Sequence, residues 1–200
     1  MLKPILVCSL SALLLAGCST EEAVSKKVVK PTELPLTLKL DESKKPANSL
    51  KNEVIYAMTG QTDKPLYLTG TEYLASGKQK IWFSETIQPG TYDGKELKLG
   101  QQFDSTKGYR SYTYELDGTM HDWSEESNAF KGVMISDVEF RDKSFRPSAY
   151  ELLMFEKSTV QETMKEKSMD TIHSPKDIRL NKGESAFTIT LSVKKVDDTL

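Results

Sequence analysis

Residues 186–196 read Ala-Phe-Thr-Ile-Thr-Leu-Ser-Val-Lys-Lys-Val, and this stretch decides the fold class. Apolar and polar side chains alternate along it, which is the period of a β-strand with one face in the core and the other in solvent. We expect the core face to carry Phe187, Ile189, Leu191 and Val193, and the solvent face to carry Thr188, Thr190, Ser192 and Lys194.

The same alternation recurs near the other end of the chain, where Leu34, Leu36, Leu38 and Leu40 are separated by polar residues or proline. Further short strands are expected at residues 53–59, 65–69, 79–87, 96–99, 109–116, 132–141 and 149–156. Turns that contain glycine separate them, at Thr59-Gly60, Ser76-Gly77, Pro89-Gly90, Asp93-Gly94, Asp117-Gly118 and Lys182-Gly183. The pattern predicts a mainly β fold, an antiparallel β-sandwich or barrel.

One short helix is expected at residues 159–167, because Ser158 followed by Gln161 fits a capping box. Residues 149–155 are ambiguous. Their apolar run favours a buried strand, and the alternative is the first turns of a helix that opens at Pro147.

The first residues have the form of a secretory signal. A basic residue, Lys3, precedes a short apolar run that is too short to span a bilayer stably, and the small residues Ala16 and Gly17 close it before Cys18. Leu15-Ala16-Gly17-Cys18 resembles the lipobox of bacterial lipoproteins. The resemblance implies diacylation of the Cys18 thiol, cleavage before Cys18, and usually a third acyl chain on the new amine.

The expected organisation follows from this signal. Residues 1–17 are the signal peptide, residues 18–32 a polar tether, and residues 33–200 a single β-rich domain. In enteric-type bacteria an aspartate after the lipidated cysteine resembles an inner-membrane retention signal. Ser19 stands there instead, which favours the outer membrane, while the periplasmic and surface faces both stay open.

Composition argues against a nucleic-acid partner and against disulfides. Removal of residues 1–17 takes away only one charged residue, Lys3, so 26 basic and 29 acidic residues remain of the 27 and 29 in the whole chain. That balance argues against a nucleic-acid partner, because such proteins usually carry a clustered basic excess. The two cysteines are Cys8, inside the signal, and Cys18, so the mature domain is expected to contain no disulfide.

Catalytic and metal-binding patterns are weak. Residues 121–126, His-Asp-Trp-Ser-Glu-Glu, place a base, an acid and a hydroxyl together, but adjacency on a polar loop does not arrange a nucleophile with its base. Oxygen ligands for calcium, or His121 for zinc, are available there without the ligand order that such sites need. We expect no catalytic residue, no metal and no cofactor.

Aromatic residues offer a different hypothesis. Tyr112 and Tyr114 share one face of a predicted strand, and Trp123 lies in a predicted loop. Tyrosine and tryptophan are favoured at protein interfaces, so these three are the candidate partner-binding residues. The alternative is ordinary pairing across a sheet, which applies least to Trp123.

Three functions follow from these observations. The first is an envelope lipoprotein, held by the lipid on Cys18, whose domain binds a protein as an assembly accessory, secretion pilot, inhibitor or immunity factor. The second is a surface-exposed lipoprotein that binds host or ligand molecules. The third is an envelope hydrolase that works with carboxylates alone, which requires a suitably spaced pair.

Overall fold

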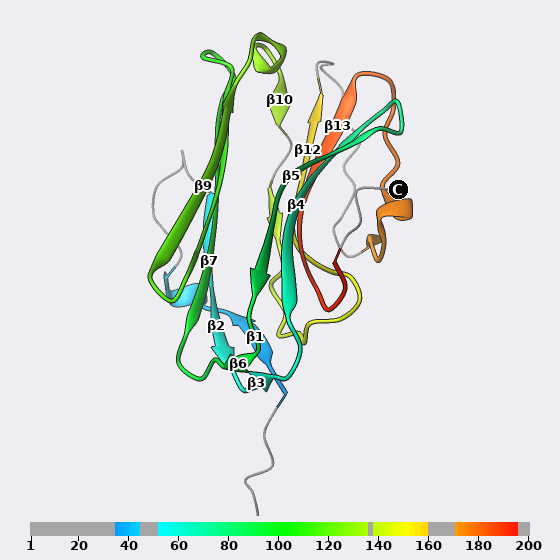
Figure 1. Cartoon of the computed structure of the whole chain (residues 1–200). Helices are drawn as coiled ribbons and strands as arrows, with labels where there is room; N and C mark the ends of the chain where they lie inside the picture. The colour runs from blue at the N-terminus through cyan, green and yellow to red at the C-terminus, as the bar shows by residue number, and fades with distance from the viewer. Residues whose placement is uncertain (1–34, 45–51, 136–137, 160–170, 196–200) are drawn as a thin grey trace, which may run out of the picture. The chain divides into compact units, whose positions relative to one another are not determined.

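Strand β13 (Glu184–Ser192) lies inside a six-stranded sheet of the computed structural model, between β12 (Glu151–Thr159) and β4 (Leu66–Leu74). The structure describes residues 35–44, 52–135, 138–159 and 171–195. These belong to one compact unit, Glu33–Leu200, in which two antiparallel sheets face each other (Figure 1). The expected mainly β, antiparallel fold is confirmed, and of the two alternatives, sandwich and barrel, the two facing sheets form a sandwich.

The first sheet has the order β1-β2-β7-β8-β9. Its strands are β1 (Thr37–Leu40), β2 (Asn52–Thr59), β7 (Glu96–Asp104), β8 (Tyr109–Leu116) and β9 (Thr119–Glu126). The second sheet has the order β10-β12-β13-β4-β5, with β11 also paired to β12. Its remaining strands are β5 (Gln79–Ile87), β10 (Met134–Ile135) and β11 (Glu139–Phe140). A third, small pair joins β3 (Gln61–Thr62) to β6 (Gly90–Thr91).

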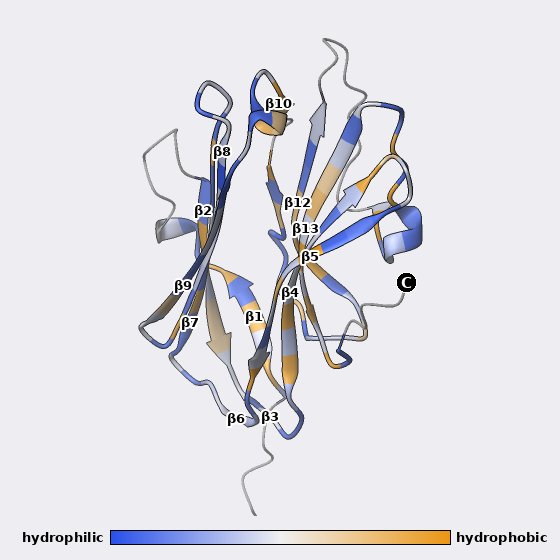
Figure 2. Ribbon diagram, turned by 45° about the horizontal axis from the view of Figure 1, so that its top comes forward, coloured by the Kyte–Doolittle hydropathy of each residue, from blue (hydrophilic) through white to orange (hydrophobic). Residues whose placement is uncertain are grey.

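The core lies between the two large sheets. The first sheet contributes, among others, the buried side chains of Leu38, Tyr56, Leu97, Leu99 and Tyr112, and the second those of Leu68, Met154, Phe187, Ile189 and Leu191. Figure 2 shows hydrophobic stretches on strands of both sheets. Burying such side chains contributes on the order of 2 kcal/mol each, so the core stabilises the domain without any disulfide.

Both faces of β13 are buried, which corrects the expected solvent face. Thr188 and Thr190 are buried like the core residue Ile189 between them. The reason is a second hydrophobic cluster on the outer side of the sheet, formed by Leu152, Phe155, Ile172 and Ala186 with Tyr150, Ile178 and Leu180 packed against it. An alternating sequence therefore does not guarantee that the polar face meets water.

The expected core position of Val193 is wrong, because the strand ends at Ser192 and Val193 is 37% exposed. The main chain turns there: the backbone N–H of Val193 donates to the carbonyl of Ser148 at 2.9 Å. Phe187, Ile189 and Leu191 do lie in the core, as expected.

Strand β12 resolves the ambiguity of residues 149–155 in favour of a strand. A bulge between Leu152 and Met154 adds one residue, so Leu152 joins the outer cluster while Leu153 and Met154 join the main core. This is why the sequence shows an unbroken apolar run there. The helix expected at residues 159–167 lies outside the described residues except for Thr159, the last residue of β12.

Short 3₁₀ turns are the helical elements of the described ranges, at η1 (Glu42–Lys44), η2 (Asn128–Phe130) and η4 (Pro175–Asp177). None of the helices that the structure describes is long and apolar enough to cross a membrane. In the described part of residues 132–141, where one strand was expected, the structure has the two-residue strands β10 and β11.

Candidate functional site at the edges of β5 and β9

Residues 121–126, which were expected to form a loop, belong to strand β9, so that expectation is wrong. Asp117 and Gly118 have φ of 53° and 78°, and two central residues with positive φ make the tight turn that suits a two-residue hairpin. The turn pairs Leu116 with Thr119 and continues β8 into an eight-residue strand at the edge of the sheet. The sequence contained one signal for this hairpin, an Asp-Gly pair followed by side chains that alternate between the two faces of a strand. The signal is weak because the alternating residues are mostly polar.

The side chains of β9 divide between its two faces. His121, Trp123 and Glu125 point toward the second sheet and are partly buried, while Met120, Asp122, Ser124 and Glu126 are exposed on the outer side. His121 and Asp122 therefore point away from each other. The base, acid and hydroxyl that are adjacent in sequence do not converge on one point.

Strand β5 faces β9 from the second sheet, and a bulge places two consecutive aromatic side chains on its inner side. Gly70 pairs with Phe83 and Thr71 pairs with Ile81, so Trp82 is the extra residue. A glycine is required opposite Phe83, because a Cβ on Gly70 would lie 2.2 Å from the Phe83 ring.

Aromatic rings join the two edges. The ring centroids of Phe83 and Trp123 are 4.0 Å apart in a stacked arrangement, and Tyr114 stacks on Trp123 at 5.4 Å and on His121 at 4.7 Å. Trp82 meets Tyr112 edge-on at 5.4 Å. Rings in these arrangements contribute about 0.5–1.5 kcal/mol per pair beyond the area that they bury.

These contacts place the three candidate partner-binding aromatics. Tyr112 is fully buried and Tyr114 is 7% exposed, so both belong to the core and neither offers its ring to a partner. Burial also raises the pKa of Tyr114 to about 12, an effect that the charge of Glu85 reinforces. Trp123 is a half-buried strand residue rather than a loop residue, because its ring fills the space between Phe83 and Tyr114.

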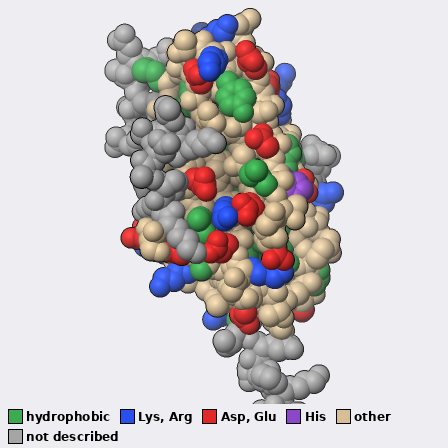
Figure 3. Space-filling model, turned by 90° about the vertical axis from the view of Figure 1, so that its left-hand side faces the viewer, with side chains coloured by type: hydrophobic (Ala, Val, Ile, Leu, Met, Phe, Trp, Pro, Cys, Tyr) green, Lys and Arg blue, Asp and Glu red, His purple; other side chains and the backbone are tan. Residues whose placement is uncertain are grey.

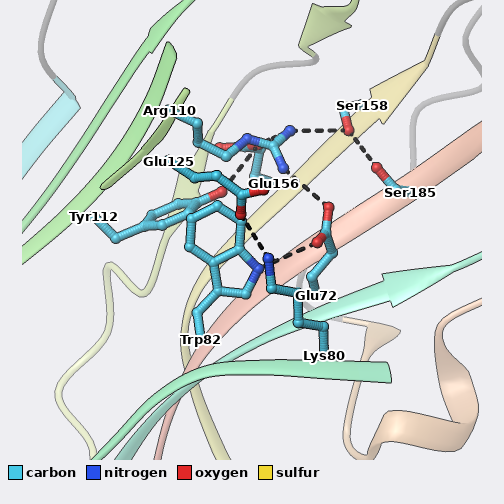
Figure 4. Close-up of polar contacts among 9 residues, drawn as sticks. All are labelled: Glu72, Lys80, Trp82, Arg110, Tyr112, Glu125, Glu156, Ser158 and Ser185. Atoms are coloured by element: carbon cyan, nitrogen blue, oxygen red, sulfur yellow. Dashed lines mark hydrogen bonds and ion pairs between the residues drawn. The ribbon is translucent and has the colours of Figure 1, made fainter. Parts of the chain in front are cut away.

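A groove of about 450 Å³ runs between the two edges. It is lined by Lys80, Ile81 and Trp82 of β5 and by Asp122, Trp123, Ser124 and Glu125 of β9. The Lys80 ammonium crosses it to reach the Glu125 carboxylate at 2.6 Å and lies 4.5 Å from the centroid of the Trp82 ring (Figure 4). The two sheet edges are thus held together by side chains.

Behind the groove lies a buried ionic network centred on Arg110, whose side chain is 2% exposed (Figure 4). Its guanidinium lies 3.2 Å from a carboxylate oxygen of Glu72 and 3.2 Å from one of Glu156. It also donates to the Ser158 hydroxyl at 3.3 Å. The Trp82 indole N–H donates to the other oxygen of Glu72 at 3.2 Å, which links this network to the wall of the groove.

Burial sets the ionisation of this network. It raises the pKa of the Glu156 carboxyl, although the charge of Arg110 opposes that shift. The Tyr112 hydroxyl donates to Glu156 at 3.4 Å, and burial raises the pKa of this phenol well above its ordinary value. Both carboxylates are occupied by Arg110 and shielded from solvent, so this pair does not form an open, carboxylate-lined cleft.

Metal-binding geometry is also missing from the part of the chain that the structure describes, where no three His, Cys, Asp or Glu side chains converge. Cys18, the expected lipidation site, lies outside the described residues. The network around Arg110 is the feature that sequence reasoning missed. Its members come from four strands, and nothing in the sequence shows that they meet.

Comparison with known proteins gives no relative. No family model matches the chain, and neither a curated protein nor a solved structure matches it. Function is therefore argued from the signal, the fold and the groove.

Proposed function

We propose that this chain is a lipid-anchored lipoprotein of the bacterial outer membrane whose β-sandwich binds a protein partner in the envelope, without a cofactor and without turnover. The observation that carries the proposal is the free edge strand β9 beside the aromatic groove. A long exposed edge is a template for pairing with another chain, and proteins usually shorten or cover such edges. In this domain the edge strand β9 spans eight residues.

The anchor supports binding rather than catalysis. Each buried methylene of an acyl chain contributes about 0.8 kcal/mol, so two or three chains on Cys18 hold the protein firmly. A domain on a tether explores a restricted volume, which raises its effective concentration for a partner in the same membrane. A shallow groove and a strand edge then suffice, even where the intrinsic affinity is weak.

The anchor is tested by labelling cells with an alkynyl fatty acid. The wild-type chain should carry the label and the Cys18→Ala variant should not. Equal labelling of the two chains would remove the anchor from the proposal.

The binding surface is tested by a photo-crosslinking amino acid placed at Met120, which is 69% exposed on β9. The matched control is the same amino acid at Leu74, 39% exposed at the end of β4 in the other sheet. In intact cells we expect a discrete crosslinked product at Met120 and none at Leu74. Failure to crosslink at Met120, or the same product at both positions, would contradict the proposal.

A further inference from the structure

We infer that β9 binds its partner by strand addition, and that the added segment is extended and basic, with Lys or Arg at alternate positions. This inference rests on the proposed function, that the domain binds a protein. It goes further, since it names the mode of binding and the chemistry of the partner segment. Two observations carry it, the unpaired backbone edge of β9 and the charge around it, and the same charge disfavours a second copy of this chain.

The backbone of β9 presents regularly spaced donors and acceptors. In an antiparallel pair, residues alternate between positions that bond to the neighbouring strand and positions that point away from it. The two-residue turn makes Leu116 and Thr119 a bonded pair, so Thr119, His121, Trp123 and Glu125 bond to β8. Met120, Asp122, Ser124 and Glu126 therefore direct their N–H and C=O groups away from the sheet.

The same four residues are exposed, and no other strand of the described residues pairs with this edge of β9. Their side chains lie on the outer face of the first sheet, the face seen in Figure 3. Alternation of side chains along each strand places on this face the carboxylates of Glu53, Glu96, Asp104, Glu115, Asp122 and Glu126, and the ammonium groups of Lys39 and Lys98. Among the described strand residues of this face, carboxylates therefore outnumber ammonium groups.

The charge on β9 itself is wholly negative. The strand contains Asp122, Glu125 and Glu126 and neither Lys nor Arg. Glu125 is paired with Lys80 across the groove, which leaves Asp122 and Glu126 as the carboxylates beside the free backbone. Opposite charges on adjacent strands stabilise a sheet by about 0.2–1 kcal/mol per pair, so a basic strand fits this edge best.

A second copy of this chain fits this edge less well than a basic strand. Two β9 strands side by side would bring their acidic side chains together, and like charges directly opposite each other destabilise a sheet. Charged side chains on an edge are a common protection against pairing between identical molecules. Here the negative charges of Asp122 and Glu126 disfavour a second copy and favour a segment of opposite charge.

In strand addition the main-chain bonds supply affinity and the side chains supply specificity. The incoming strand would bond to the backbone of Asp122 and Ser124. Its basic side chains would lie next to Asp122 and Glu126 on the outer face. The exposed side chain of Met120 offers an apolar contact at the end nearest the turn.

The experiment uses the full chain in detergent and an eight-residue peptide, Lys-Val-Lys-Thr-Lys-Val-Lys-Thr, with glutamate in place of lysine in the control peptide. NMR should show binding of the basic peptide and slower amide exchange at Met120, Asp122, Ser124 and Glu126. Affinity should fall with added salt, because the charges are exposed. Protection confined to another surface, or equal binding of the acidic peptide, would overturn the inference.

Two variants at one position test the main-chain bond. Ser124→Pro removes the N–H that points away from the sheet, and proline is tolerated on an edge where that N–H faces solvent. We expect it to weaken binding about tenfold, since one hydrogen bond is lost and the approach of the strand is disturbed. Ser124→Ala keeps the N–H and should bind like the wild type. Equal affinities of the two variants would overturn strand addition.

A charge reversal tests the chemistry of the partner segment. Asp122→Lys should weaken binding of the basic peptide and strengthen that of the acidic one. Glu53→Lys is the matched control, because Glu53 lies on the same face but on β2, away from the free edge. Equal effects of the two reversals would mean that the whole face, and not β9, attracts the peptide, and the inference would fail.

These results separate the inference from the proposed function. If Met120 crosslinks to a partner in cells while the basic peptide does not protect the β9 amides, the domain binds a protein by another mode and only strand addition fails. If the peptide binds as expected but Met120 gives no crosslink in cells, the proposed function fails and the strand-addition chemistry stands.

Discussion

At the scale of single residues, Arg110 is the largest of the fully buried side chains that the structure describes. It is a permanent charge inside the sandwich, and two carboxylates with surrounding aromatic rings take the place of water. Such groups are weak evidence for net stability, because the cost of desolvation offsets the attraction. Removing one member of the network destabilises the fold, because it leaves the other charges buried and uncompensated.

Arg110→Met is therefore expected to lower the free energy of unfolding by about 3–5 kcal/mol, since Glu72 and Glu156 lose their counter-charge. The control is Lys98→Met, which removes a partly exposed ion pair with Glu115 and should cost about 0–1 kcal/mol. Urea denaturation measures both values. Similar losses of stability for the two variants would show that Arg110 is not a buried counter-charge of Glu72 and Glu156.

Gly70 is constrained by the ring beside it. We expect Gly70→Ala to destabilise the domain by about 1–3 kcal/mol, because the new Cβ would displace the Phe83 ring and with it the stack on Trp123. Gly90→Ala is the control, since a Cβ there meets open space. Thermal unfolding gives the stability, and tryptophan fluorescence reports the stack. Unchanged fluorescence in Gly70→Ala would contradict the contact.

At the scale of elements, β13 shows how burial depends on the neighbours of a strand. Phe187, Ile189 and Leu191 face the first sheet, and the threonines of β13 lie under the outer cluster. The Thr190 hydroxyl donates to the carbonyl of Thr69 at 3.4 Å, so the buried polar group has a partner. A strand that looks half-exposed in the sequence is thus central in the fold.

Leu191→Ala is expected to lower the free energy of unfolding by about 2–5 kcal/mol, because it opens a cavity in the core. Val193→Ala, two residues on, should change it by no more than about 0.5 kcal/mol, because Val193 lies outside the strand and in solvent. Chemical denaturation of the two variants tests the end of the strand at Ser192. A large loss of stability for Val193→Ala would show that the strand continues beyond Ser192.

At the scale of the whole molecule, the buried network couples stability to pH. Burial raises the pKa of Glu156 above its usual 4.5, so the native state binds a proton more readily than the unfolded chain. The stability that this group contributes is fully present below pH 4.5 and is lost as the pH rises through the raised value. Asp177 and Glu184 have lowered pKa values, and their contributions are lost as the pH falls.

The variant Glu156→Gln separates the pH dependence that is due to Glu156 from that due to Asp177 and Glu184. We expect its free energy of unfolding, relative to that of the wild type, to increase as the pH rises from 4.5 toward neutrality, because the wild type alone must ionise a buried carboxyl there. Urea denaturation across this pH range measures the difference. A constant difference would mean that Glu156 ionises as easily in the folded domain as in the unfolded chain.

Much of the secondary structure of this protein could be predicted from its sequence. Alternation and glycine turns located nearly every long strand, and the bounds of β5 and β8 match the expectation. These features are local, because the period of a strand and the φ of a turn are properties of neighbouring residues. The lipobox-like signal is local too, and it remains the sequence's only indication of where the protein acts.

The tertiary structure alone decided which polar residues are buried. Arg110, Glu72 and Glu156 lie far apart in the chain and meet only because β8 of the first sheet faces β4 and β12 of the second. Residues 121–126 look like a loop in sequence, yet pairing with β8 makes them an edge strand with a free backbone. Long-range pairing and the packing of two sheets set these contacts, and neither is a property of any short stretch of sequence.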